Sequence, residues 1–576
     1  MRDCWLVSRQ AAIAVSVTAQ NVTPYVNPAV PTGTPVPGNY TGGLRPQVHF
    51  SPPQHFMNDP NGMFVDANNT WHLYYQYNPT GVVAGNQHWG HATSQDLYHW
   101  ENQPIALFPP EKNVFVFSGS AVVDVNNTSG FFPDQDNGVV AITTLARYYD
   151  DGSAGPQTQG LAYSLDGGYT FEYYDGNPVI DSSSSQFRDP KVIWYEDHWV
   201  MVIAFAQEFV VGIYTSPNLI NWTHASNFSH HGLLGAQYEC PNMVKLPIRD
   251  SVGGAVVDEA YVIAVSVQPG APLGGSITQY FPGTFNGTHF ETFDSATRLT
   301  DFAKDNYAAQ YFYGTPDGSN AINMGWASNW QYAQTVPTGN LEGWRSAMTL
   351  PRENYLTNAT RIGWIMANEL VDITPVLDTP LNTTTFEGNG SIAVDYSSVS
   401  SGTLYIEANV TGLNASTVTS ASTLNISFTS PSSGETIRSG YYFGGDQPYF
   451  IDRGLVRGFD NIFFTDKFST ADVWNATSGS WRVQAVIDRS ILEIFLEGGV
   501  HAATTLFFPK EPLTIMSLAT AGLPAGVEVS VAVWSVQSAW AEYENEQGTV
   551  LGNVTDSDIG NATARRDMIY EATWSV

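Results

Sequence analysis

The sequence predicts an all-β protein, with a five-bladed β-propeller followed by a C-terminal β-sandwich. From about residue 46 the chain consists of short strand patterns broken by turns, as in "KVIWYEDHWVMVIAF", where two apolar runs flank a charged turn. No strong amphipathic helix pattern precedes about residue 360. A second set of alternating strands follows, including "GTLYIEANV" and "WRVQAVIDRSILEIFLEGG", which is typical of a two-sheet sandwich.

A degenerate unit recurs in the first strand-rich region and indicates the blades. It occurs as "SQDLYHWE", "SLDGGYTFE", "SPNLINWTH" and, more loosely, "GTFNGTHFE", each a small polar turn followed by an aromatic residue. The copies lie about 50 to 70 residues apart, in the range of propeller repeats. Residues 46–360 then hold about five blades, and a large irregular sandwich is the alternative.

The other segments are divided by composition. Residues 1–20 have a short apolar centre and small residues near their end, which predicts a possible leader. Residues 21–45 are rich in Pro, Gly and Thr and are predicted to be extended. Residues 361–385 are the expected linker and residues 386–576 the expected sandwich domain. This second domain either braces the propeller or mediates a dimer, or it is a separate sugar-binding module.

Charge and composition exclude several classes of partner. Lys and Arg total 23 against 54 Asp and Glu, for a formal charge of -31, which disfavours nucleic acid and anionic membranes. No apolar stretch is long enough to span a membrane. Aromatic residues reach 13%, which suits a cleft for a neutral sugar as well as strand packing. The two cysteines, Cys4 and Cys240, exclude a disulfide framework, and no metal site is predicted.

Asn-x-Ser/Thr acceptors are abundant along the chain, about seventeen by the sequon rule. Examples are "NVT" at residue 21, "NWT" at 221 and "NAT" at 358. Together with the scarcity of Lys, this density predicts a secreted, N-glycosylated protein.

Three carboxylates share one local pattern, in which an acid is followed, directly or after one residue, by Pro and then by a strand. They are Asp59 in "MNDPNG", Asp189 in "FRDPKV" and Glu239 in "YECPNM". Each stands at the entrance of what resembles the first strand of a different blade, and first strands line the central channel of a propeller. A single Asp-Pro is most often a turn cap, but three in the same context predict that the acids converge at one channel mouth.

Such a set of acids suits glycoside hydrolysis with retention. One carboxylate attacks the anomeric carbon and a second protonates the leaving oxygen, with their carboxyl groups about 5 to 5.5 Å apart. The nucleophile must be ionised while the acid is protonated, so their environments must differ. We expect Asn58 to supply donors that keep the neighbouring Asp59 ionised.

These motifs resemble the signature motifs of glycoside hydrolase family 32, which contains invertases, inulinases and fructosyltransferases, and indicate a secreted, fungal-type member. The similarity continues through "YYQYNP", "HWGHATSQDLYHW", "FSGSAV" and "GWRSAMTLPRE" and covers most of residues 46–510 in family order. It implies the same propeller and sandwich. It also implies that Asp59 is the nucleophile, Glu239 the acid/base and Asp189 the transition-state stabiliser.

The resemblance further implies a fructose pocket formed by Asn58, Gln76, Trp89, Phe117, Ser118, Arg188, Asp305 and Trp326. Arg188 also has an independent reason to be there, because a cation limits the cost of clustering Asp189 with Glu239. Two positions that border this pocket depart from the family pattern: Phe56 and Tyr238 stand where Trp is usual or frequent. One interpretation is that Phe56 and Tyr238 fill the pocket wall as Trp does in other members. The alternative is that they change how often water or a sugar accepts the fructosyl group.

The predicted function is a β-fructofuranosidase that releases terminal β-D-fructofuranosyl groups from sucrose and fructo-oligosaccharides and also transfers fructose. The alternatives are a dedicated fructosyltransferase, an exo-inulinase or levanase and, more remotely, a non-catalytic fructan-binding protein. The expected partners are small sugars, with neither nucleic acid nor membrane, and a homodimer is possible. No metal or nucleotide cofactor is implied.

Overall fold

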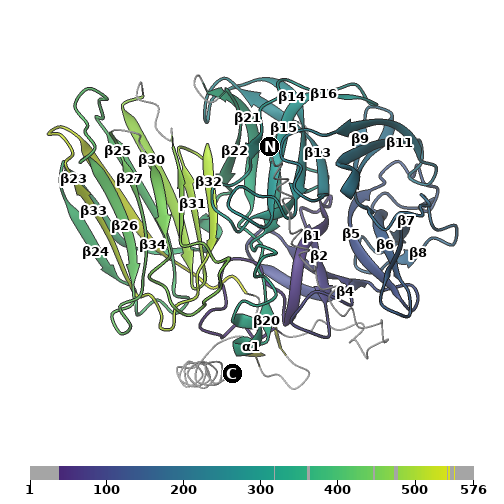
Figure 1. The fold of residues 1–576 in the computed structure, drawn as a ribbon, viewed down its shortest axis with the longest axis horizontal. Coiled ribbons are helices and arrows are strands. Elements are labelled where there is room, and N and C mark those ends of the chain that lie inside the picture. Colours follow the sequence, from purple (N-terminus) through teal and green to yellow (C-terminus); the bar gives the residue numbers. More distant parts are fainter. Residues whose placement is uncertain are drawn as a thin grey trace, which may run out of the picture.

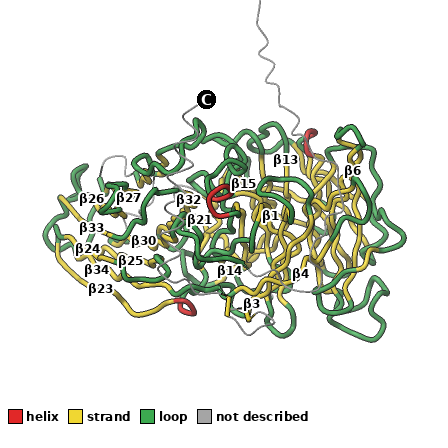
Figure 2. Tube along the Cα trace, turned by 90° about the horizontal axis from the view of Figure 1, so that it is seen from below, coloured by secondary structure: helices red, strands yellow, loops and turns green. Residues whose placement is uncertain are grey.

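The computed structural model describes residues 38–316, 318–359, 363–444, 448–471 and 478–540, together with the strand pair β35 (Tyr543–Glu544) and β36 (Val550–Leu551). Nearly all of the regular structure in these ranges is β, arranged as a propeller beside a two-sheet sandwich (Figure 1), and helical segments are few and short (Figure 2). The predicted fold class is confirmed. The expected leader at 1–20 and residues 21–37 of the expected extended segment lie outside the described residues.

Blades I to III are antiparallel sheets of four consecutive strands each. Blade I contains β1 (His55–Val65), β2 (Trp71–Asn78), β3 (His88–Ser94) and β4 (Trp100–Leu107). Blade II contains β5 (Val114–Val123), β6 (Val139–Tyr148), β7 (Ala154–Ser164) and β8 (Glu172–Tyr173). Blade III contains β9 (Phe187–Tyr195), β10 (His198–Phe205), β11 (Val210–Ser216) and β12 (Thr223–Ser229), with the 3-10 turn η1 (Ala206–Glu208) between β10 and β11.

Blades IV and V share one nine-stranded sheet, because β13 and β21 pair in parallel. Blade IV contains β13 (Tyr238–Arg249), β14 (Val256–Val267), β15 (Ile277–Phe285) and β16 (Phe290–Thr292), with β17 (Arg298–Leu299) added to β15. Blade V contains β18 (Tyr307–Tyr311), β19 (Ala321–Trp326), β21 (Arg352–Ala359) and β22 (Gly363–Leu370). β22 falls in the range expected to be a linker, but it pairs with β21 along its whole length and completes the blade.

The five first strands close a ring around the channel. β1 packs on β5, β5 on β9, β9 on β13, β13 on β18 and β18 on β1. The short strand β20 (Trp344–Arg345), which follows the helix α1 (Thr338–Glu342), pairs in parallel with the start of β1. Because neighbouring blades cover both faces of each first strand, β1 is buried at nearly every position.

The same irregularity interrupts all five first strands near their beginning. In each, two residues face a single residue of the next strand, which is the definition of a β-bulge. The bulged pairs are Asn58 and Asp59 in β1, Phe117 and Ser118 in β5, Asp189 and Pro190 in β9, Cys240 and Pro241 in β13, and Ala308 and Ala309 in β18. The bulges therefore form a ring at one mouth of the channel.

The second domain is a sandwich of two six-stranded antiparallel sheets, reached through the 3-10 turn η2 (Thr374–Val376). One sheet has the order β23 (Leu377–Glu387), β34 (Glu528–Val536), β25 (Thr403–Thr411), β30 (Ser480–Asp488), β31 (Ile491–Leu496), β32 (His501–Leu506). The other has the order β24 (Ser391–Asp395), β33 (Ile515–Ala521), β26 (Thr423–Thr429), β27 (Thr436–Tyr442), β28 (Tyr449–Asp452), β29 (Lys467–Thr470). Inward-facing aliphatic and aromatic side chains of both sheets form one continuous core.

Buried ion pairs cross from the propeller to the sandwich. Arg352 on β21 contacts Asp301, in the connection before β18, and Glu493 on β31 of the sandwich, both at 3.3 Å. Arg453 of the sandwich reaches Asp305 at 2.9 Å, and all of these side chains are almost fully buried. A buried charge that loses its partner is strongly destabilising. This interface favours the bracing role for the second domain.

Asp305, expected in the sugar pocket, lies in this interface. Its carboxylate accepts hydrogen bonds from the Tyr332 hydroxyl, from Arg453 and from the Leu506 N–H, and its side chain is fully buried. Arg453 and Leu506 belong to the second domain, which the motif containing Asp305 does not specify. The structure therefore does not place Asp305 in the sugar pocket.

Substituting Asp305→Ala is expected to lower the free energy of unfolding by about 3–5 kcal/mol, because Arg453 would remain as an uncompensated buried charge. The control is Asp294→Ala, which removes the more exposed ion pair with Arg298 and is expected to cost about 1 kcal/mol or less. Denaturant unfolding of both variants measures the difference. Equal losses would contradict a bracing role for the Asp305–Arg453 pair.

Candidate active site

The three predicted acids all stand at the ring of bulges. Asp59 is the second bulged residue of β1, Asp189 the first bulged residue of β9, and Glu239 directly precedes the bulge of β13. Asp189 and Cys240 have left-handed backbone conformations, with φ of 64° and 46°. Such values are uncommon for residues other than Gly and mark positions held by their surroundings. The bulges thus re-aim side chains from three blades toward one mouth.

Asp59 is buried, with its Oδ2 held from two sides. The Ser118 hydroxyl donates to Oδ2 at 2.7 Å, and the Cys240 thiol lies 3.4 Å from the same oxygen. Burial raises the pKa of Asp59, the hydrogen bond from Ser118 opposes this, and the nearby charge of Glu239 raises the pKa further. Asn58 also favours the ionised form, as expected from the sequence.

Glu239 is the most accessible of the three acids, with 15% of its side chain exposed. Its Oε1 accepts hydrogen bonds from Arg188 Nη2 and Gln237 Nε2, both at 3.0 Å. The Tyr307 hydroxyl donates to Oε2 at 2.5 Å. Both carboxyl oxygens are therefore fixed in direction while one edge of the group stays open to a substrate.

Asp189 lies between the other two acids. The Cys240 N–H donates to its Oδ2 at 2.9 Å, and Arg188 Nε lies 3.9 Å from the same oxygen. Burial raises the pKa of Asp189 to about 7, with Arg188 lowering it and the charges of Glu239 and Asp59 raising it. The two buried acids, Asp59 and Asp189, thus hold their protons more tightly than isolated carboxyl groups do.

Arg188 is the cation of the site. Burial lowers the pKa of its guanidinium, but the charges of Glu239 and Asp189 outweigh this and raise it overall. Its Nη1 donates to Gln186 at 2.8 Å and to Gln157 at 3.3 Å, which fixes the plane of the group. Arg188 therefore lies beside Asp189 and Glu239, as expected from the sequence, and its place in a fructose pocket stays a prediction.

Two further predicted residues support the bulge of blade II. Gln76 Nε2 donates to the Val116 carbonyl and Trp89 Nε1 to the Phe117 carbonyl, each at 3.1 Å. Trp89 is completely buried and Gln76 nearly so, whereas Phe117 is partly exposed. These two side chains therefore orient Ser118 and the Phe117 ring through the backbone.

The aromatic residues expected at the pocket lie at two different places. Phe56 and Trp326 pack with each other and with the partly exposed Trp330, and Trp326 also contacts the ring of Tyr307, so they form the wall behind the acids. Tyr238 is completely buried in the core between blades III and IV, where its hydroxyl donates to the His231 carbonyl. Adjacent residues of a strand face opposite sides, so Tyr238 points away from Glu239, and the structure does not place it at the pocket.

Sequence reasoning missed Tyr307 and the thiol of Cys240. Tyr307 directly precedes the bulge of β18, the register position that Glu239 occupies in β13 and Arg188 in β9. Aligning the five first strands by register would have found it, although "DNYAAQ" lacks an acid-Pro signature.

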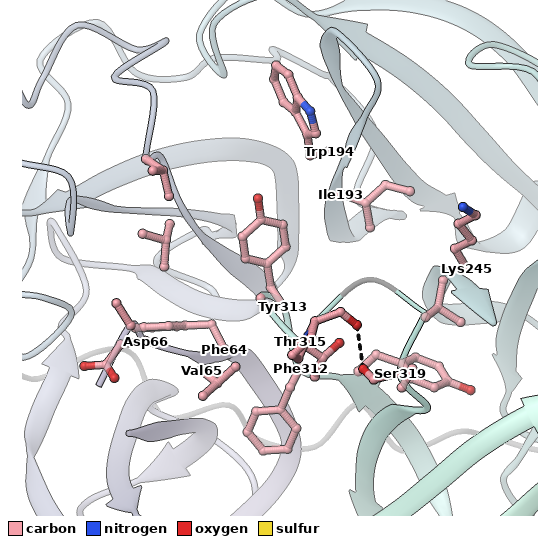
Figure 3. Close-up of a pocket in the computed structure, with 18 of the residues that line it drawn as sticks. Phe64, Val65, Asp66, Ile193, Trp194, Lys245, Phe312, Tyr313, Thr315 and Ser319 are labelled. Atoms are coloured by element: carbon pink, nitrogen blue, oxygen red, sulfur yellow. Dashed lines mark hydrogen bonds between the residues drawn. The ribbon is translucent and has the colours of Figure 1, made fainter. Parts of the chain in front are cut away.

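A cavity of about 590 Å³ lies at the far ends of the first strands and not at the acids. Its lining includes Phe64 of β1, Ile193 and Trp194 of β9, and Tyr313 in the β18–β19 connection (Figure 3). The acids stand near the beginning of the same strands. The channel therefore has two chemically distinct ends, and we call the end with the acids the catalytic face and the other the far face.

The described ranges contain neither a candidate metal cluster nor a membrane-spanning helix. No cluster of three or more His, Cys, Asp or Glu side chains there is arranged to hold a metal ion. No helix in those ranges is long and apolar enough to cross a membrane.

Comparisons with known proteins agree with this geometry. The family model of the glycosyl hydrolases family 32 N-terminal domain matches residues 49–363, and that of the family 32 C-terminal domain matches residues 374–535. The chain belongs to glycosyl hydrolase family 32.

Individual family members resemble the chain over most of its length. An extracellular exo-inulinase of Meyerozyma guilliermondii is 40% identical over 478 residues, covering 81% of this chain and 90% of the relative. Invertase 2 of Saccharomyces cerevisiae is 40% identical over 490 residues, covering 81% and 89%. The structure of a fructofuranosidase from Schwanniomyces occidentalis, complexed with fructose, has 36% identity and a TM-score of 0.77, covering 87% of this chain and 99% of that one.

Substituting Ser118→Ala is expected to shift the acid limb of the pH profile of kcat/KM on sucrose to higher pH. The lost hydrogen bond favours the ionised form of Asp59, so its removal raises the pKa of a group that must be ionised to attack. The control is Ser120→Ala on the same strand, whose hydroxyl accepts from the Val192 N–H and does not contact Asp59. An unchanged acid limb in the Ser118 variant would contradict this role.

Substituting Asp189→Asn is expected to abolish activity and yet raise the thermal midpoint of unfolding, increasingly so from pH 4 to pH 8. The folded-state pKa of Asp189 is about 7, above its ordinary value of 3.8. Its contribution to stability is therefore present at low pH and lost as pH rises through about 7. Calorimetric scans across this range measure the difference, and a gap independent of pH would contradict it.

Proposed function

We propose that the chain is a secreted, retaining β-fructofuranosidase that cleaves terminal β-D-fructofuranosyl groups from sucrose and fructo-oligosaccharides. The observation that carries this is the network of hydrogen bonds and one ion pair that joins Asp59 to Glu239 through Cys240, Asp189 and Arg188. Retaining glycosidases need such a pair of carboxyl groups close together. Extracellular exo-inulinases among the relatives support secretion.

In the first step Glu239 gives its proton to the glycosidic oxygen while Asp59 attacks the anomeric carbon of the fructosyl group. The bond from that carbon to the leaving oxygen breaks, glucose departs from sucrose, and an ester joins the fructosyl group to Asp59. Asp189 accepts hydrogen bonds from the sugar hydroxyls and stabilises the positive charge that develops on the ring. Ser118 favours the ionised form of Asp59, and Arg188 fixes the orientation of Glu239.

In the second step Glu239 acts as a base, after acting as an acid in the first. Glu239 takes a proton from water as the water oxygen attacks the anomeric carbon, and the ester bond to Asp59 breaks. Fructose leaves with net retention, and the starting protonation states are restored. A sugar hydroxyl in place of water gives transfructosylation by the same route.

Transfer and polymer hydrolysis are the second candidate functions. The Schwanniomyces occidentalis β-fructofuranosidase has also been solved with fructosyl-erythritol bound, a fructosylated acceptor. The exo-inulinase relatives favour activity on inulin. A non-catalytic fructan-binding role is disfavoured because the three acids and their supporting donors are all present. A homodimer remains a prediction.

Product analysis from concentrated sucrose tests the proposal. Wild-type enzyme is expected to release glucose, with equal fructose if it only hydrolyses and less free fructose if it transfers. Asp59→Ala is expected to lose on the order of 10⁴-fold or more in kcat, as when a covalent nucleophile is removed. Asp66→Ala, at the far end of β1, is the matched control and should retain activity. Near wild-type glucose release by Asp59→Ala would refute the assignment.

A further inference from the structure

The Asn-x-Ser/Thr sequons of the propeller are distributed unevenly between its two faces. First strands run from the catalytic face to the far face, and the pairing register fixes the direction of every later strand. By this register the β1–β2, β5–β6, β11–β12 and β15–β16 connections and the C-terminal end of β21 all lie on the far face. Each carries or adjoins a sequon, with acceptors at Asn68, Asn126, Asn221, Asn286 and Asn358.

At least one exposed acceptor on the far face therefore falls in each of the five blades. Asn68 belongs to blade I, Asn126 to blade II, Asn221 to blade III, Asn286 to blade IV and Asn358 to blade V. All five side chains belong to exposed residues. A chance distribution of sequons would have no reason to follow the repeat of the fold.

The connections on the catalytic face lack sequons. They comprise residues 79–87, 108–113, 149–153, 206–209, 230–237, 268–276 and 327–343. Asn86, Asn113, Asn329 and Asn340 occur there, but none has Ser or Thr two residues later. Asn itself is thus common to the connections of both faces, whereas the connections that carry the acceptor motif lie on one face.

The local geometry of the far-face acceptors suits modification. Asn286 follows directly after the end of β15 and is exposed. Its Oδ1 accepts hydrogen bonds from the N–H of Thr288 and of His289, which closes the turn. Asn68 stands in a tight turn in which its own N–H donates to Asp66, so its side chain is not needed to close the turn. The other two blade sequons differ in position, because Asn127 is only partly exposed and Asn227 lies within strand β12 and not in a connection.

The structure assigns the far face as the glycosylated face of the propeller, with one N-linked oligosaccharide per blade at Asn68, Asn126, Asn221, Asn286 and Asn358. The donor class is an oligosaccharide on a lipid diphosphate. The Asn amide nitrogen attacks the anomeric carbon, a C–N bond forms as the C–O bond to the diphosphate breaks, and the nitrogen loses one proton to a base while the lipid diphosphate leaves. This assignment rests on the secretion proposed above.

The two mouths of the channel then differ: the far face carries glycans and the catalytic face does not. Asn68 and Val125 line the rim of the 590 Å³ cavity, so a glycan on Asn68 begins at the mouth of that cavity. Glycans are bulky and strongly hydrated, and they restrict what approaches the surface that carries them. With the catalytic face bare, a fructan chain reaches Glu239 without meeting a glycan.

The test is peptide mass spectrometry of the full chain secreted from a yeast host. Peptide N-glycosidase in ¹⁸O-water converts each glycosylated Asn to labelled Asp, and the label is expected at all five far-face positions. Secreted enzyme with these five Asn unmodified would overturn the proposal. Enzyme that never reaches the medium would overturn the proposed secretion as well, and activity on sucrose, measured separately, tests the chemistry independently.

A matched pair of variants tests whether a glycan on the catalytic face lowers activity. Asp151→Asn creates an Asn-Gly-Ser sequon in the exposed β6–β7 connection, next to Tyr148, whose ring contacts Phe117. The glycosylated variant is expected to lose kcat/KM on inulin and to regain it on enzymatic deglycosylation, whereas Asp151→Gln stays within about twofold of wild type. Deglycosylating the wild-type far face should leave kcat/KM unchanged. The proposal is refuted if a glycan at residue 151 does not change kcat/KM on inulin. It is also refuted if removing the glycans of the wild-type far face lowers kcat/KM.

Discussion

Repulsion among three clustered carboxylates is the constraint on which the site depends. Asp59, Asp189 and Glu239 share one network, and the charge of Glu239 makes ionisation of the buried Asp59 and Asp189 more costly. Arg188 offsets this cost and is itself fixed by two glutamines. The remaining repulsion is useful, because it favours the state in which one acid is ionised and another holds a proton, as acid and nucleophile require.

The geometry that brings these charges together comes from a repeated backbone feature. Five first strands carry a bulge at the same register position, so residues from different blades reach one mouth without long loops. Rigid strands position side chains more accurately than loops do. The acids nevertheless occupy three different positions around their bulges, which explains why Asp59 and Glu239 present different faces to a shared substrate.

Much of this was predictable from the sequence, because the signals are local. Turn chemistry before an apolar run marked the acids, and the spacing of the repeats indicated the blades. The failures concern information that is not local. Tyr238 neighbours Glu239 in the chain but faces the opposite side of the strand, and Asp305 lies near the site in sequence but pairs with Arg453, some 150 residues later. Tyr307 was missed because its role depends on register with other blades and on no motif of its own.

The blades are not joined to one another by equal numbers of strand pairs, and this difference affects how the enzyme loses activity on heating. Blades IV and V share a continuous sheet, whereas blade I is joined at the seam by two parallel residue pairs, His55 with Trp344 and Phe56 with Arg345, and by a bridge from Phe64 to Tyr313. Blades I, II and III are otherwise separate sheets, so local opening is expected at the junctions between sheets, this seam included, before it occurs within a sheet. Because Phe56 is three residues from Asp59, opening of this seam displaces the nucleophile while most blades are still intact. Thermal inactivation would then precede unfolding, and the working lifetime of the enzyme would be set by the rate at which one seam parts.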